Sequence, residues 1–154
     1  MSSRLQAEIK QTKPFATLEH EAILGLLRTA AIVDHATDEM LRPYGLTGTQ
    51  FNVLRILRGA GQQGLCGREI GERMITRVPD VPRLLDRMEK AELISRERDS
   101  EDRRHVTARI TPKGRQLVED IGRAASNPIE RRFSRLAPEQ LQSLIEAMDL
   151  IREG

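Results

Sequence analysis

The stretch Leu93–Gly114, LISRERDSEDRRHVTARITPKG, decides the fold of this chain. Two short runs with β-strand character flank a charged tip at residues 99–104, DSEDRR. In the second run Val106, Ala108 and Ile110 alternate with polar residues, which is the pattern of a half-buried strand. The stretch therefore predicts an antiparallel β-ribbon with a charged loop at its end.

The residues that follow the ribbon predict the start of a helix. Thr111 is suited to the N-cap and Pro112 to the first helical position. The tip of the ribbon is too polar to be buried, and it carries Arg103 and Arg104. A two-stranded ribbon tipped with arginines has a shape that can enter a nucleic-acid groove.

Two short helices are predicted immediately before the ribbon. The first covers about residues 67–74, and a tight turn at 75–78 separates it from the second. The second has an apolar stripe at helical spacing, formed by Val81, Leu84, Leu85, Met88 and Ala91. Its opposite side presents Asp80, Arg83, Asp86, Arg87 and Lys90. Two short helices, a tight turn and a β-ribbon form a winged helix-turn-helix.

Longer helices are predicted on both sides of this unit. One covers about residues 16–41, and another begins at the capping box of Thr47 and Gln50. A helical tail follows the ribbon, and Asn127-Pro128 should interrupt it. Both terminal regions carry wider apolar stripes than a small unit can cover, so we expect them to pair in a two-fold dimer.

The predicted fold class is mainly α with a small antiparallel β-wing. We expect a winged helix-turn-helix with N- and C-terminal dimerisation helices. The predicted divisions are a flexible N-terminal segment at 1–15, a single domain at 16–154, the winged unit at about 46–111, and dimerisation helices at about 16–42 and 112–152.

Composition excludes several classes of protein. Aromatic residues make up only 3% of the chain, which argues against single-strand binding by base stacking. No apolar run approaches the ~18 residues of a membrane span, and the N-terminus lacks an apolar signal core. The lone cysteine, Cys66, fits a reducing compartment, so we expect a cytoplasmic protein without membrane association. The net charge is only +2, so any case for DNA binding depends on how the charges are arranged.

At this point the chain resembles the MarR family of bacterial winged-helix regulators. The matching passages are the helix-to-strand run LLDRMEKAELI at 84–94, the loop DSEDRR at 99–104, ITPKG at 110–114 and the helix start LTGTQF at 46–51. Their order and spacing carry the resemblance. It implies a homodimer on a pseudo-palindromic operator of double-stranded DNA, with a recognition helix in the major groove and the wing in the minor groove. It also implies a repressor released by a small aromatic or phenolic effector.

The chain departs from the family pattern at two places. Glu92 stands where the family usually has glycine, and a left-handed turn there would cost a non-glycine residue about 1 kcal/mol. Residues 78–82, VPDVP, replace the small hydroxyl residues that usually open the recognition helix. We expect Pro79 at the first helical position, and Pro82 at the fourth, where it would make the first turn irregular or 3₁₀-like.

Candidate DNA-binding residues follow from this arrangement. On the recognition helix they are Arg77, Asp80, Arg83 and Arg87; on the wing they are Arg103 and Arg104, supported by Asp99 and Asp102. Arginine can take guanine N7 and O6 together, and aspartate can accept from a cytosine amino group. A loop arginine suits a narrow A·T-rich minor groove. The alternative is a solvated face on which Asp86 pairs with Lys90.

Other functions have less support in the sequence. One alternative is that the recognition face binds a protein. Another is that Cys66 senses oxidants, although we expect Cys66 to be a buried structural thiol. His35 on the first long helix is either an ordinary histidine or part of a ligand cavity. No catalytic constellation is present, so we expect neither an enzyme, nor a cofactor, nor a metal.

Overall fold

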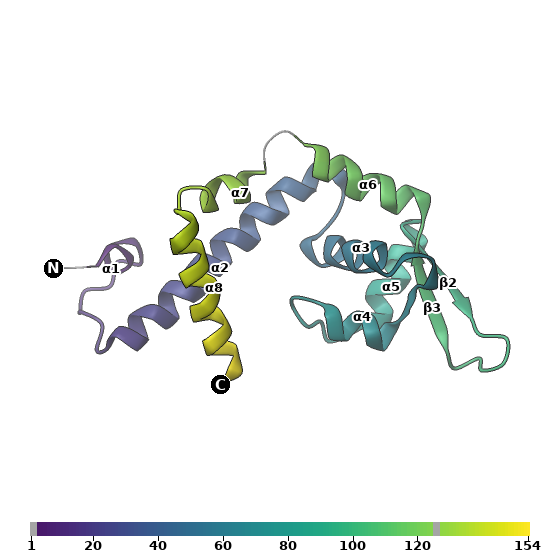
Figure 1. Cartoon of the computed structure of the whole chain (residues 1–154), viewed down its shortest axis with the longest axis horizontal. Coiled ribbons are helices and arrows are strands. Elements are labelled where there is room, and N and C mark those ends of the chain that lie inside the picture. Colours follow the sequence, from purple (N-terminus) through teal and green to yellow (C-terminus); the bar gives the residue numbers. More distant parts are fainter. Residues whose placement is uncertain (1–2, 125–126) are drawn as a thin grey trace.

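The computed structural model describes residues 3–124 and 127–154. Two parts are visible in Figure 1: a helical arm built on a long helix, and a winged unit at the other end of it. The elements, in chain order, are α1 (Arg4–Glu8), α2 (Leu18–Leu41), η1 (Arg42–Tyr44), α3 (Gly48–Ala60), η2 (Gly61–Gln63), β1 (Leu65–Cys66), α4 (Gly67–Arg73), α5 (Val81–Lys90), β2 (Ile94–Arg98), β3 (Val106–Ile110), α6 (Pro112–Arg123), α7 (Pro128–Phe133) and α8 (Pro138–Glu153). The predicted fold class is confirmed.

Several helix boundaries lie where the sequence places them, because local capping fixes them. Thr47 and Gln50 form a reciprocal capping box at the start of α3, and Gly61 with φ 66° ends that helix. Thr111 Oγ1 accepts the N–H of Gly114 at 3.0 Å and caps α6, with Pro112 at the first helical position. Asn127 caps α7, so the predicted interruption of the tail is also present.

The sheet has three antiparallel strands in the order β1-β3-β2. In the wing, Arg96 of β2 lies opposite Ala108 of β3, and Leu65 of β1 lies on the other side of Ala108. Ala108 is almost fully buried, whereas the other residues of β3 on both faces are half-buried, so the predicted inward face is clear only at Ala108. The central position of β3 attaches the wing firmly to the helical part of the unit.

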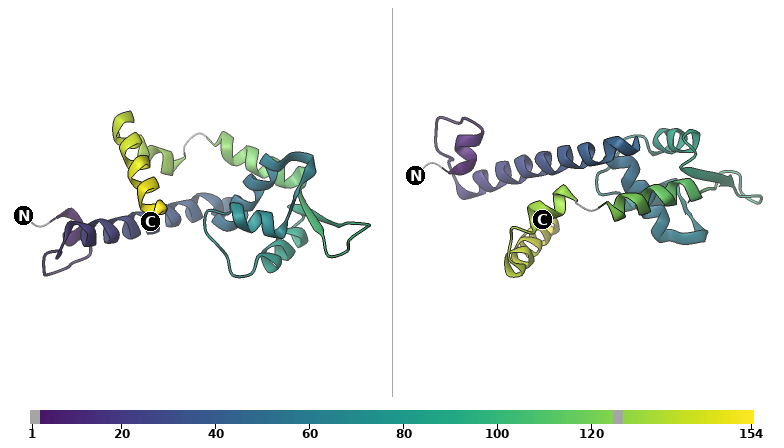
Figure 2. Two further views of the ribbon diagram at one scale, coloured as in Figure 1. Left: turned by 60° about the horizontal axis from the view of Figure 1, so that its bottom comes forward. Right: turned by 90° about the horizontal axis from the view of Figure 1, so that it is seen from above.

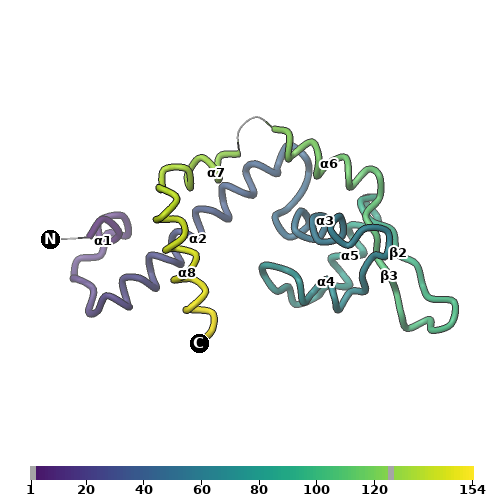
Figure 3. Tube along the Cα trace, viewed as in Figure 1, coloured from purple at the N-terminus to yellow at the C-terminus, as the bar shows by residue number. Residues whose placement is uncertain are grey.

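The hydrophobic core lies inside the winged unit. Its most completely buried large side chains are Leu41, Val53, Leu54, Leu57, Ile70, Met88 and Ile94. They come from α2, α3, α4, α5 and β2, so the last turn of the arm helix and the recognition helix share one core. The tube in Figure 3 follows the chain from α2 through this unit and back to the arm by way of α6.

The arm contrasts with the winged unit, because its apolar residues remain exposed. Helix α7 packs against α2, whereas α8 projects from the arm (Figure 2). The large exposed apolar side chains lie on α2 and α8. They are Leu18, Ile23, Leu26, Leu27, Ile32, Leu144, Ile145, Leu150 and Ile151. In the predicted flexible segment, residues 4–8 form α1, capped by Ser3.

Residues 3–124 and 127–154 include no helix that is both long enough and apolar enough to cross a membrane. Nor do these residues bring three or more histidine, cysteine, aspartate or glutamate side chains together where they could hold a metal ion.

Candidate nucleic-acid interface

Helix α5 is the second helix of the helix-turn-helix, and it begins later than the sequence suggested. Asp80 is its N-cap: Oδ1 of Asp80 accepts the N–H of Arg83 at 3.0 Å. Pro82 therefore occupies the second helical position, where a missing N–H removes no helical hydrogen bond. Pro79 lies outside the helix. The prediction that Pro79 opens the helix and Pro82 disturbs its fourth position was wrong, because the aspartate caps better than the valine before Pro79.

The first turn of α5 is regular. The N–H of Leu84 donates to the carbonyl of Asp80 at 3.2 Å, which is the α-helical pattern. An irregular or 3₁₀-like turn is therefore absent at this place. Asp80 was predicted to read a base; the structure gives its carboxylate a capping role, and a base contact stays a prediction.

Three of the predicted DNA-binding arginines, one in the turn before α5 and two on α5, have side chains without a partner in the described part of the chain. Arg77 in the turn and Arg83 and Arg87 on α5 are all exposed. Within the described residues, no hydrogen bond or ion pair engages their guanidinium groups. Arg83 and Arg87 are four residues apart, so they lie on one face of the helix. Unpaired, exposed guanidinium groups on one face are available for a large anionic partner.

The wing loop is held by its own aspartates. Oδ1 of Asp99 accepts the N–H of Glu101 at 2.9 Å, and Oδ1 of Asp102 accepts the N–H of Arg104 at 3.0 Å. The carbonyl of Asp102 also accepts the N–H of His105 at 2.9 Å. Both predicted support residues thus stabilise the backbone of the loop, as side chains of this type do in Asx-turns.

The two wing arginines differ in their surroundings. Nε of Arg104 lies 3.6 Å from Oδ1 of Asp102, although the side chain remains 96% exposed. Arg103 is held through its backbone instead, because its carbonyl accepts a hydrogen bond from Arg98 at 3.1 Å. Both guanidinium groups project from a loop whose backbone is ordered by hydrogen bonds.

Arg96 joins the wing to α5, and sequence reasoning missed this contact. Its guanidinium donates to Oε1 of Glu89 at 3.1 Å and also pairs with Asp86. Its backbone N–H donates to Oε2 of Glu89 at 3.0 Å. The hydrogen bond that Glu89 accepts from Arg96, together with the one that Asp86 accepts, raises the pKa of Arg96 despite partial burial. The solvated-face alternative paired Asp86 with Lys90. In the structure Asp86 pairs instead with Arg96 on the wing.

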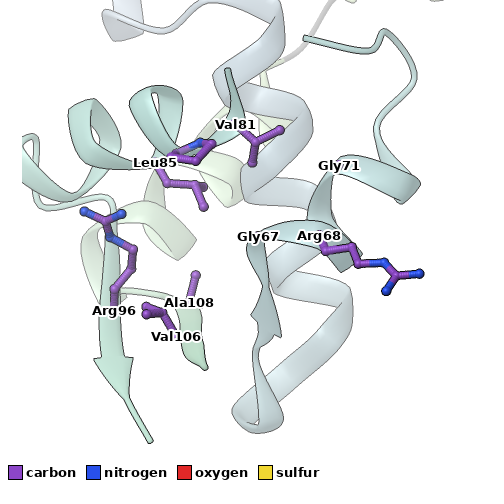
Figure 4. A pocket seen from close by; sticks show the side chains of 9 residues that line it. Gly67, Arg68, Gly71, Val81, Leu85, Arg96, Val106 and Ala108 are labelled. Atoms are coloured by element: carbon purple, nitrogen blue, oxygen red, sulfur yellow. The ribbon is translucent and has the colours of Figure 1, made fainter. Parts of the chain in front are cut away.

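An apolar cavity of about 420 Å³ lies behind α5, against α4 and the sheet (Figure 4). Val81, Leu85, Val106 and Ala108 contribute its walls. Arg96 also lines it, and the buried Nε of Arg96 has no hydrogen-bond partner among the residues described. The guanidinium of Arg68, in contrast, points away from the cavity.

Cys66 and His35 lie away from the arginine face of α5. We expected Cys66 to be buried, but it is only half-buried. It lines a hollow of about 610 Å³ beside Arg68, Arg104 and His105. Its backbone N–H donates to Glu69 at 2.9 Å, and this hydrogen bond lowers the pKa of Glu69. His35 is exposed on α2 and lines another hollow, of about 620 Å³, between α2 and α7.

Comparison with known proteins gives one consistent family. The sequence profile described as "MarR family" matches residues 46–106. Two regulators of Bacillus subtilis strain 168 are similar to this chain. The uncharacterised HTH-type transcriptional regulator YkoM is 33% identical over 68% of this chain and 66% of its own length. The HTH-type transcriptional regulator MhqR is 30% identical over 77% of this chain and 79% of its own length.

Solved structures agree with these sequence relatives. A MarR transcription factor from Planctomyces limnophilus is 33% identical, with a TM-score of 0.68 over 88% of this chain and 98% of that chain. MepR of S. aureus, solved as a MepR–DNA complex, is 25% identical, with a TM-score of 0.74 over 83% of this chain and 94% of that one. The reported relatives are transcriptional regulators and not enzymes.

Proposed function

The chain belongs to the MarR family of transcriptional regulators, and we propose that it acts as a dimeric repressor on pseudo-palindromic double-stranded DNA. One observation carries the proposal. The unpaired arginines of α5 and the arginine-tipped wing lie on elements that Arg96 ties together. A rigid pair of reading elements fits a major groove and the minor groove beside it.

The residues take distinct roles in this proposal. Arg83 and Arg77 contact base edges in the major groove, where the fork of an arginine matches guanine N7 and O6. Arg87, further along α5, contacts phosphate. Arg104, and with it Arg103, enters the minor groove, where a narrow A·T-rich segment concentrates negative potential. Asp99 and Asp102 keep the wing loop in shape.

A dimer is supported by the exposed apolar residues of the arm. Leu18, Ile23 and Leu27 on α2, and Leu150 and Ile151 on α8, are each more than half exposed. An apolar surface of this extent is uncommon on a monomeric protein. A second copy related by a two-fold axis would cover these residues and set the distance between two recognition helices.

Relief by a small aromatic or phenolic effector is the regulatory part of the proposal. The cavity behind α5 supports it, because its walls are apolar and the side chain of Arg96 also lines it. A ligand changes DNA affinity only if it binds one geometry of the dimer better than the other. As a DNA-binding regulator, the protein would work in the cytoplasm.

Direct binding tests the proposal. Fluorescence anisotropy should be measured on a duplex covering the upstream region of this gene and on a scrambled duplex, each over a salt series. We expect tight, sequence-dependent binding that weakens steeply with salt, because phosphate contacts release counterions. If both duplexes bind equally weakly, either the upstream region lacks the operator or DNA is not the partner. Selection from a random duplex library then distinguishes these two explanations. Failure to enrich any sequence would refute DNA recognition and favour a protein partner.

A further inference from the structure

Ile75 is the most exposed large apolar side chain of the residues described, at 88%. It belongs to the turn between α4 and α5, and this turn is the loop beside the left end of α4 in Figure 1. The other large exposed apolar residues lie on α2 or α8, apart from Ile9 near α1. The proposed dimer contact therefore accounts for those on the arm but does not account for Ile75.

The turn holds Ile75 outward by contacts on both sides of it. Met74 is buried, and Val78 packs against the same core. Between them, the backbone N–H of Ile75 donates to Oδ1 of Asn52 on α3 at 2.9 Å. The exposure of Ile75 is thus a fixed feature of the helix-turn-helix.

The neighbours of Ile75 narrow down what can cover it. Thr76, Arg77 and Asp80 are exposed and polar, and the free guanidinium of Arg83 lies on the first turn of α5. One apolar group in such a setting does not suit an apolar protein face. It does suit the major groove, where the C5-methyl of thymine is the apolar group among polar base edges.

We propose that Ile75 reads the methyl group of a thymine at the side of the recognition helix away from the wing. The inference rests on the proposed DNA binding and adds a specificity residue to it. Asn52 is a positioning residue, because it fixes the backbone that carries Ile75. The chain thereby gains an apolar reader beside the arginines of α5.

Deletion of single methyl groups tests this. In the selected operator, each thymine is replaced in turn by deoxyuridine, which lacks only the C5-methyl, and affinity is measured for wild type and Ile75→Ala. At one position in each half-site, we expect wild type to bind the deoxyuridine operator about fourfold more weakly than the thymine operator. This corresponds to the loss of one buried CH₂ group, worth ~0.8 kcal/mol. Ile75→Ala should be weaker on the thymine operator and insensitive to the replacement at that position.

Controls separate this contact from a general loss of binding. Ile9→Ala removes the same atoms near α1 and should keep the full response to deoxyuridine. Asn52→Ala should reduce the response, because the turn is no longer held. If wild type binds the operator tightly but no replacement depends on Ile75, the inference is refuted while DNA recognition stands. If wild type binds no duplex specifically, the proposed function itself fails.

Discussion

Arg96 and Glu89 are joined twice, once through side chains at 3.1 Å and once from the backbone N–H of Arg96 to Oε2 of Glu89 at 3.0 Å. Glu89 belongs to α5 and Arg96 to the first strand of the wing. The position of the wing relative to the recognition helix is therefore set by a specific polar contact as well as by apolar packing. Because the Arg96 side chain is only 22% exposed, water weakens this contact less than it weakens a surface pair.

Replacing Arg96 by methionine should impair both stability and specificity. The change removes the guanidinium from two carboxylates of α5, although Glu89 keeps the backbone N–H of residue 96, so we expect the free energy of unfolding to fall by about 1–2 kcal/mol. The affinity for the operator should fall further than the affinity for non-specific DNA, because the wing is no longer held in a fixed position relative to α5. Urea denaturation and anisotropy measure the two effects.

Arg68→Met is the matched control for that change. Arg68 also pairs with a glutamate, Glu72 at 3.0 Å, but both side chains are well exposed. Such a pair contributes only about 0.3–0.5 kcal/mol. Equal losses of stability in the two variants would show that the contact of Arg96 has no special importance.

Arg104→Ala should weaken binding mainly through the minor groove. We expect the loss to be larger for operators with A·T-rich flanks than for G·C-rich ones, because only the former have a narrow, strongly negative groove. Arg152→Ala on α8 removes the same charge far from the wing, and an equal effect from it would argue against wing insertion.

Gly114→Ala should destabilise the winged unit. A Cβ at this position would lie 2.3 Å from the carbonyl oxygen of Leu93, which is backbone and cannot move aside cheaply. We expect a loss of about 2–3 kcal/mol in the free energy of unfolding, as for other overpacked sites. Gly122→Ala on the same helix meets nothing within 4 Å, and should instead stabilise by about 0.5–1 kcal/mol. A similar outcome for both variants would contradict the packing described.

Glu92→Gly should stabilise the protein. Glu92 has φ 61°, in the left-handed region that was expected from its position after the recognition helix. Relief of about 1 kcal/mol of strain, less the roughly 0.5–1 kcal/mol entropic cost of ordering a glycine, should leave a net gain of up to about 0.5 kcal/mol. Glu92→Ala keeps the Cβ and should show no gain in thermal melting; a gain from alanine would mean that the charge, and not the backbone, limits stability.

Leu27→Asp and Ile145→Asp should prevent self-association. Both side chains are exposed on the arm helices, and a buried charge opposite its own symmetry mate is costly. Sedimentation velocity should show a dimer for wild type and a monomer for either variant. Gln63→Asp adds the same charge in the winged unit and should remain dimeric, whereas a monomeric wild type would refute the proposed assembly.

How much the sequence could predict depends on the range of each interaction. Thr47 with Gln50, and Thr111 with Gly114, act within four residues, and both caps were predicted correctly. The start of α5 was misplaced because two prolines suggested a boundary that the Asp80 cap overrides. Arg96 pairs with carboxylates seven and ten residues away on another element, and Asn52 binds Ile75 across 23 residues. No periodic pattern reveals such pairs. Helix α1 was not predicted, because its five residues show no apolar pattern.

The most direct measurement is the affinity of wild type and Arg83→Ala for the selected operator and for a scrambled duplex of equal length, over the same salt series. If the recognition helix reads bases, Arg83→Ala should lose about 1–3 kcal/mol on the operator and little on the scrambled duplex. Its salt slope should stay close to that of wild type. Equal losses on both duplexes, or no loss on the operator, would contradict base reading by this helix.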